Sequence, residues 1–115
     1  MKSRIVACVA LVAIATALVA GAGKSDIADA AQRGDRAAVQ KLILQKVDVN
    51  APQVDGATAL HWAVYRQDAE LADMLIRAGA NVKATNRTGM TPLAMASLYG
   101  NAGLIDRLIK AGADA

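Results

Sequence analysis

The sequence predicts an all-α fold, a solenoid of helix-turn-helix units, because the chain repeats itself every 33 residues. Residues 58–63 (TALHWA) recur as 91–96 (TPLAMA), and residues 75–81 (LIRAGAN) recur at the same offset as 108–114 (LIKAGAD). A third and weaker copy lies one period earlier, with Ser25 in the place of Thr58. Such self-similarity is typical of arrays in which each unit buries its apolar face against its neighbours.

The first helix of each unit is expected to begin just after a hydroxyl side chain. Ser25, Thr58 and Thr91 precede apolar runs, where a hydroxyl oxygen can accept a hydrogen bond from an unpaired N–H of the first turn. Pro92 follows Thr91 at the first helical position, where a missing N–H does no harm. The expected helices of about two turns begin near Ile27, Leu60 and Leu93.

The second helix of each unit is expected over residues 37–45, 69–77 and 102–110. Each range carries apolar residues at helical spacing, which gives one apolar stripe per helix. Gly79 and Gly112 stand just beyond two of these helices, where a left-handed residue closes the last turn. The first unit has Lys46 at that place, which costs about 1 kcal/mol if it keeps the same backbone conformation.

The first 22 residues have the features of a secretory signal peptide. Lys2 and Arg4 precede an uncharged run over residues 5–20, and small residues follow at 20–22. We expect cleavage near Ala22 and an exported protein, either periplasmic or secreted. The alternative is an uncleaved membrane anchor, although this apolar run is shorter than the ~20 residues that usually span a bilayer.

Removal of this leader changes the net charge and the cysteine content of the chain. Thirteen basic and ten acidic residues give the whole chain a net charge of +3, but Lys2 and Arg4 belong to the leader. The remaining chain is nearly neutral, so its charge gives no reason to expect nucleic acid as a partner. A membrane would be contacted only through the N-terminal segment, if that segment is uncleaved. The single cysteine, Cys8, is also lost, which excludes disulfides and thiol chemistry in the mature chain.

The repeated motifs resemble those of ankyrin repeats. Residues 58–61 (TALH) and 91–93 (TPL) are similar to the Thr-Pro-Leu-His start of the family's repeat, and residues 79–82 (GANV) are similar to its Gly-Ala-Asp-Val segment. The resemblance covers residues 23–115 and implies units at about 23–55, 56–88 and 89–115. It also implies projecting, hairpin-like loops near residues 47–57 and 80–90. Together with the leader, it suggests an exported, bacterial-type member of this family.

No set of residues predicts catalysis, a metal site or a cofactor. His61 is the only histidine in the chain. A catalytic histidine needs an orienting carboxylate and a nucleophile, and the sequence shows no recognisable pattern of these. A metal site needs further histidine, cysteine or clustered carboxylate ligands, and the sequence does not supply these in the usual pattern. The resemblance implies a structural role for His61, with hydrogen bonds near the helix start and between units. The acidic groups at Asp26, Asp29 and Asp35 suit helix starts and solvated faces. We therefore expect a protein that is not an enzyme.

Binding of another protein is the expected function. Arrays of this family usually bind proteins with their loop tips and the inner face of the first helices, and the positions that vary there include most of the chain's few aromatics. Tyrosine and arginine are common energetic anchors of interfaces, so a patch of Tyr65, Arg66, Leu98 and Tyr99 is the central candidate. Trp62 and Met95 are expected to be half-buried packing residues. The further candidates are Gln32, Arg33, Asp55, Arg87 and Met90.

The last unit keeps an apolar stripe in its second helix, at Leu104, Ile105, Leu108 and Ile109. Terminal units of repeat arrays usually present a polar outer face, so the sequence predicts that this unit is truncated or that a partner covers the stripe. Two functions remain open at this point. One is an exported scaffold that binds a protein; the other is an accessory segment of a longer exported or membrane-tethered protein whose activity lies beyond Ala115.

Overall fold

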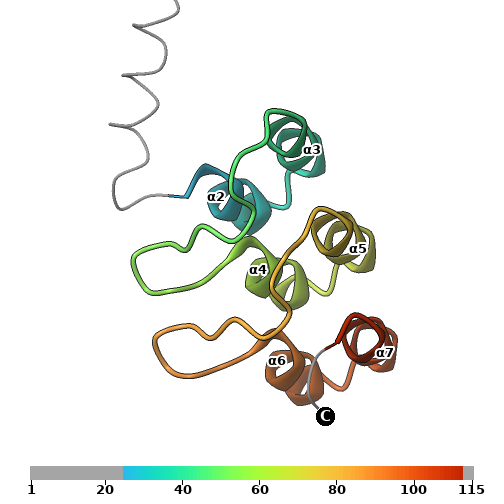
Figure 1. Cartoon of the computed structure of the whole chain (residues 1–115). Coiled ribbons are helices and arrows are strands. Elements are labelled where there is room, and N and C mark those ends of the chain that lie inside the picture. Colours follow the sequence, from blue (N-terminus) through green and yellow to red (C-terminus); the bar gives the residue numbers. More distant parts are fainter. Residues whose placement is uncertain (1–24, 113–115) are drawn as a thin grey trace, which may run out of the picture.

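The computed structural model of the protein describes residues 25–112, and the signal peptide predicted at 1–22 lies outside them. Within the described residues there are six helices and no β-strand, in three successive pairs (Figure 1). The pairs are α2 (Asp26–Arg33) with α3 (Arg36–Leu44), α4 (Ala59–Tyr65) with α5 (Ala69–Arg77), and α6 (Pro92–Tyr99) with α7 (Ala102–Lys110). The all-α repeat fold is therefore confirmed.

The helix pairs stack side by side in two layers. Helices α2, α4 and α6 form one layer and α3, α5 and α7 form the other, while the two long loops project from the side of the first layer (Figure 1). Helices α5 and α7 have the predicted bounds. Helix α3 begins at Arg36, one residue earlier than predicted, because Asp35 caps it by accepting a hydrogen bond from the Ala38 N–H at 3.0 Å.

A polar side chain caps the N-terminus of every described helix. The first helices use the hydroxyl groups that the sequence indicated: Ser25, Thr58 and Thr91. The second helices use side-chain amide or carboxylate oxygens: Asp35, Asp68 and Asn101. These caps matter because helices of seven to nine residues are too short to be stable alone in water.

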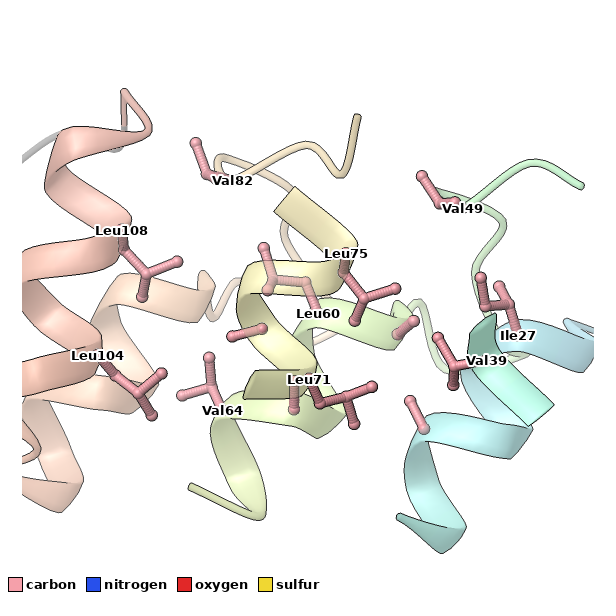
Figure 2. Close-up of a cluster of buried hydrophobic side chains, with 14 of the residues drawn as sticks. Ile27, Val39, Val49, Leu60, Val64, Leu71, Leu75, Val82, Leu104 and Leu108 are labelled. Carbon is pink, nitrogen blue, oxygen red and sulfur yellow. The ribbon is translucent and has the colours of Figure 1, made fainter. Parts of the chain in front are cut away.

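The buried core runs without interruption through all three units (Figure 2). Each helix pair contributes, and Val49 and Val82 from the two loops close the same side of the core. The largest fully buried aliphatic side chains are Ile27, Val39, Leu60, Val64, Leu71, Leu75, Leu104 and Leu108. Because these residues come from every unit, the stability of each unit depends on its neighbours.

The apolar stripe of α7 is not left open as the sequence suggested. Leu104 and Leu108 are fully buried and point toward α4 and α5 of the preceding unit (Figure 2). Ile105 is half-buried, and only Ile109, with 45% of its surface exposed, is substantially open to solvent. The prediction was wrong for the two leucines because residues one position apart on a helix lie about 100° apart, so the stripe divides between two faces.

Polar pairs also link neighbouring units. Arg36 makes two hydrogen bonds to the Asp68 carboxylate, at 2.8 and 2.9 Å, and a third to Glu70 at 3.0 Å. Burial opposes ionisation of Asp68, but the hydrogen bonds from Arg36 and from the Leu71 N–H, together with the charge of Arg36, outweigh it and lower the pKa of the carboxyl group. Between the next two units, Arg107 Nε lies 3.1 Å from the Asp73 carboxylate. These contacts join residues 32 to 34 positions apart.

The two projecting loops have hairpin-like tips without β-strands. The Gln53 N–H donates to the Ala57 carbonyl at 2.8 Å, and the Asn86 N–H donates to the Met90 carbonyl at 3.1 Å. The loops are also bonded to each other, since the N–H of Arg87 donates to the Asp55 carbonyl at 2.8 Å. A Cβ atom at Gly56 would approach the Arg87 backbone nitrogen to 3.0 Å, so glycine permits this close contact.

Candidate binding surface

Three aromatic rings meet on the layer formed by the first helices. The centroids of Trp62 and Tyr65 in α4 lie 5.3 Å apart, and those of Tyr65 and Tyr99 in α6 lie 6.2 Å apart, both in edge-to-face geometry. Tyr65 is 55% exposed and Tyr99 is 40% exposed, whereas Trp62 is half-buried against the core. The rings therefore form a short ladder that crosses from the second unit to the third.

A small pocket lies beside this ladder, between the loops and the first helices. Its volume is about 220 Å³. The lining residues come from both loops and from two helices, and they are Asp55, Ala57, His61, Trp62, Tyr65, Asn86 and Met95. The pocket thus combines aromatic and aliphatic walls with a carboxylate and an amide.

His61 holds one wall of the pocket in place. Its Nδ1 lies 3.0 Å from the Thr58 backbone nitrogen, which donates the hydrogen, so Nδ1 is an acceptor and Nε2 carries the proton. Nε2 then donates to the Met90 carbonyl of the next loop at 2.9 Å. Burial lowers the pKa of His61 below its usual value of 6.5, so the ring is neutral at pH 7. Both nitrogens serve structural hydrogen bonds.

Gln53 fixes the position of the first loop against two units. Its Nε2 donates to Asp29 Oδ1 at 2.7 Å and to Gln32 Oε1 at 2.9 Å, both in α2. Its Oε1 accepts a hydrogen bond from the indole Nε1 of Trp62 at 2.9 Å. The indole is therefore held in one orientation, and the loop is tied to the helices that carry the aromatic ladder.

A family model described as "Ankyrin repeats (3 copies)" matches residues 27–115, which is more than half of the chain. The chain belongs to the ankyrin repeat family. Ankyrin repeats are protein–protein interaction modules, generally without enzymatic activity. No curated protein matches this chain.

The other predicted contact residues are distributed over the ankyrin array rather than gathered at one point. Leu98 is 75% exposed, and it directly precedes Tyr99. Arg33 is also exposed, on the first unit. Arg66 Nη1 donates to the Gln32 carbonyl at 3.0 Å, so this guanidinium also helps to close the end of α2.

The loop candidates similarly combine exposure with structural contacts. Arg87 Nη2 donates to the Val54 carbonyl at 3.0 Å, and Asp55 Oδ1 accepts a hydrogen bond from the Ala57 N–H at 3.1 Å. Met90 is half-buried, and its carbonyl is the acceptor for His61. These three residues therefore make hydrogen bonds that hold the loops of the ankyrin repeats in place, in addition to lying at or near the loop tips.

Sequence reasoning missed the pocket as such. It placed Trp62 and Met95 among packing residues and Asp55 among the contact candidates, but it did not indicate that these side chains line one pocket together with Asn86. Gln53 was missed as an anchor because its partners lie 21 and 24 residues away, at no multiple of the repeat. The only signal for this region was that Tyr65 and Tyr99, two of the chain's three aromatic residues, stand at positions that the repeat leaves free.

The described part of the chain gives no sign of a metal centre. Residues 25–112 contain no group of three or more histidine, cysteine or carboxylate side chains that could hold a metal ion. Within the same residues, no helix of the ankyrin repeats is long and apolar enough to cross a bilayer.

Proposed function

We propose that the protein is an exported, non-enzymatic binding module that captures another protein on the inner face of its ankyrin repeats. The observation that carries this proposal is the exposed ladder of Tyr65 and Tyr99, with the exposed Leu98 next to Tyr99 in the sequence. Exposed aromatic side chains that lie together on a folded domain, as Tyr65 and Tyr99 do, commonly mark interaction surfaces. Tyrosine in particular combines a wide apolar face with a polar end, which suits a surface that is alternately wet and buried.

The surroundings of the ladder support a preformed surface. Gln53 and Arg66 fix the neighbouring loop and helix end through hydrogen bonds to α2. His61 ties the second loop to α4. A surface that is already ordered loses little conformational freedom when a partner binds, which favours affinity.

The export part of the proposal rests on the N-terminal sequence alone. The basic start, the uncharged run and the small residues near Ala22 are the features of a cleaved leader. Expression of the whole chain in a bacterium, followed by cell fractionation and N-terminal sequencing, tests this. Protein that stays in the cytoplasm with an intact N-terminus would contradict export.

The binding proposal is tested by replacing both tyrosines with alanine (Tyr65→Ala with Tyr99→Ala). We expect captured protein from a periplasmic extract to fall at least about tenfold, because truncated interface anchors usually cost more than 1 kcal/mol each. The thermal midpoint should change little, since both rings are substantially exposed, Tyr65 by 55% and Tyr99 by 40%.

Leu44→Ala is the matched control for this experiment. Leu44 is 69% exposed at the end of α3, in the other helix layer, so its truncation removes apolar surface away from the inner face. Capture should be unchanged by it. Equal capture by the tyrosine variant and the native protein would refute the proposed surface, and a large fall in its thermal midpoint would assign the rings to the core.

A further inference from the structure

We infer that the pocket beside the aromatic ladder receives a single basic side chain, a lysine or an arginine, from the bound protein. This inference rests on the proposed function, because it assigns the chemistry that the partner presents to the inner face. It concerns the pocket lined by Asp55, Trp62, Tyr65 and Met95, with His61 at its wall.

The size of the pocket favours one side chain as its occupant. Sites for whole small molecules usually measure about 300–1,000 Å³, whereas this pocket measures about 220 Å³. It lies between the two loops, whose tips are joined by the hydrogen bond from the Arg87 N–H to the Asp55 carbonyl. A partner segment lying across the loops could therefore direct one residue into it.

The charge of the pocket favours a cation. Asp55 is the one charged residue among those that line it, because the lowered pKa of His61 leaves the imidazole neutral at pH 7. The Asp55 carboxylate accepts a hydrogen bond from the Ala57 N–H and forms no ion pair among residues 25–112. Arg87 of the second loop is not part of the lining, and its guanidinium donates to the Val54 carbonyl.

The aromatic walls add to this preference, and two hydrogen-bond donors of the pocket are already used within the protein. A cation is attracted to the faces of tryptophan and tyrosine rings, by about 0.5–2 kcal/mol according to the degree of desolvation. The indole N–H of Trp62 is occupied by Gln53, and the Nε2–H of His61 is occupied by Met90. An acidic side chain would therefore meet a carboxylate and find these two donors already used.

The inference can be tested directly because Trp62 is the only tryptophan in the chain. The probes are unstructured peptides, acetyl-GSGXGSG-amide, in which X is arginine, lysine, citrulline, norleucine or glutamate. Titration at millimolar concentrations is followed by Trp62 fluorescence and by the NMR shift of its indole N–H. We expect saturable binding of the arginine and lysine peptides, at least about tenfold tighter than that of the citrulline and norleucine peptides.

Asp55→Asn separates the charge from the fold. Asparagine keeps an Oδ1 that can accept the Ala57 N–H, so the loop turn should persist while the negative charge is removed. Binding of the basic peptides should weaken about tenfold. Asp106→Asn, an exposed carboxylate on α7 far from the pocket in sequence, is the matched control and should leave binding unchanged.

Several outcomes overturn the inference: no saturable change with either basic peptide, equal binding of the neutral peptides, or unchanged binding by Asp55→Asn. They are distinguishable from failure of the proposed function. If the pocket does not discriminate charge but the tyrosine variant still loses its captured protein, the inner face binds by other means. If the pocket does discriminate charge while the tyrosine variant keeps its captured protein, the proposed function fails and the pocket assignment stands.

Discussion

At the scale of single residues, His61 shows how one side chain can connect two units. It completes a capping box with Thr58 at the start of α4 and also donates to the Met90 carbonyl in the next loop. The neutral ring is required, because a proton on Nδ1 would face the Thr58 N–H that it now accepts. The sequence indicated the structural role through the family resemblance, and the hydrogen bonds confirm it.

The lowered pKa of His61 has a consequence for stability. As the pH falls below about 6.5, the unfolded chain binds a proton at His61 while the folded chain does not, so folding stability decreases. The contribution of His61 to the free energy of unfolding should be fully present above about pH 6.5. It should decline as the pH falls toward the lower pKa of His61 in the folded protein. Thermal unfolding between about pH 8 and pH 5 measures this.

His61→Gln is the control for this pH dependence. Its thermal midpoint should be lower at pH 8, since the two-sided hydrogen bonding is lost, but it should vary less between pH 8 and pH 5. A native-like slope in this variant would show that another group causes the pH dependence.

The same scale shows where sequence reasoning reaches its limit. Tyr65 and Tyr99 could be identified as exposed because they stand at positions that the repeat leaves free, whereas their ring contact depends on the offset between neighbouring helices. Gln53 could not be assigned to its partners, since a flexible amide in a loop has many possible acceptors along the chain. Side-chain hydrogen bonds between elements require the packing distances that only the folded structure supplies.

At the scale of elements, the way each helix ends follows the repeat more closely than the residue types do. Lys46 has φ = 65°, in the left-handed region, although glycine stands at the equivalent positions of the other units. Gln67 likewise has φ = 54°, where the first and third units have Gly34 and Gly100. The sequence predicted the helices and their ends because capping residues and apolar periodicity are local signals. The left-handed conformation of Lys46 shows that packing between units prevails over the local preference of a lysine residue.

Lys46→Gly should therefore stabilise the protein. A left-handed conformation costs a non-glycine residue about 1–2 kcal/mol, and the greater freedom of glycine in the unfolded chain returns about 0.4–1 kcal/mol of that. We expect a net gain of about 0.5–1 kcal/mol, measured as the change in the free energy of unfolding by urea titration.

Gly79→Ala is the matched opposite change, at the equivalent place after α5. A Cβ atom there would meet nothing within 4 Å, so only the backbone conformation (φ = 100°) is tested. The variant should lose stability by about 1 kcal/mol. If Lys46→Gly is neutral or destabilising while Gly79→Ala behaves as expected, the Lys46 side chain makes a stabilising contribution that outweighs its backbone strain.

At the scale of the whole molecule, each unit has one face toward the preceding unit and another toward the following one. In α7, Leu104 and Leu108 belong to the first face and are fully buried, whereas Ile109 retains much of its exposure. The sequence predicted the repeat array and the apolar character of α7. It could not divide the stripe between the two faces, because a 3.6-residue period marks an apolar side of a helix without saying which neighbour covers it.

Two adjacent residues of α7 test this division. Leu108→Ala should cost about 2–5 kcal/mol in the free energy of unfolding, as truncation of a buried leucine usually does. Ile109→Ala removes a side chain of the same size from a partly exposed position and should cost less than about 1 kcal/mol. Urea unfolding of both variants decides the matter: equal losses would mean that the two faces are packed alike.

The polar pairs between units have a consequence for the evolution of the array. Arg36 meets Asp68 and Glu70 of the next unit, but one period further along the chain these places hold Asn101 and Gly103. Deletion of the middle unit would therefore bring Arg36 against residues that carry no charge. Although the three units share one backbone plan, this charged contact is specific to the first and second units, so an exchange of units would not preserve it.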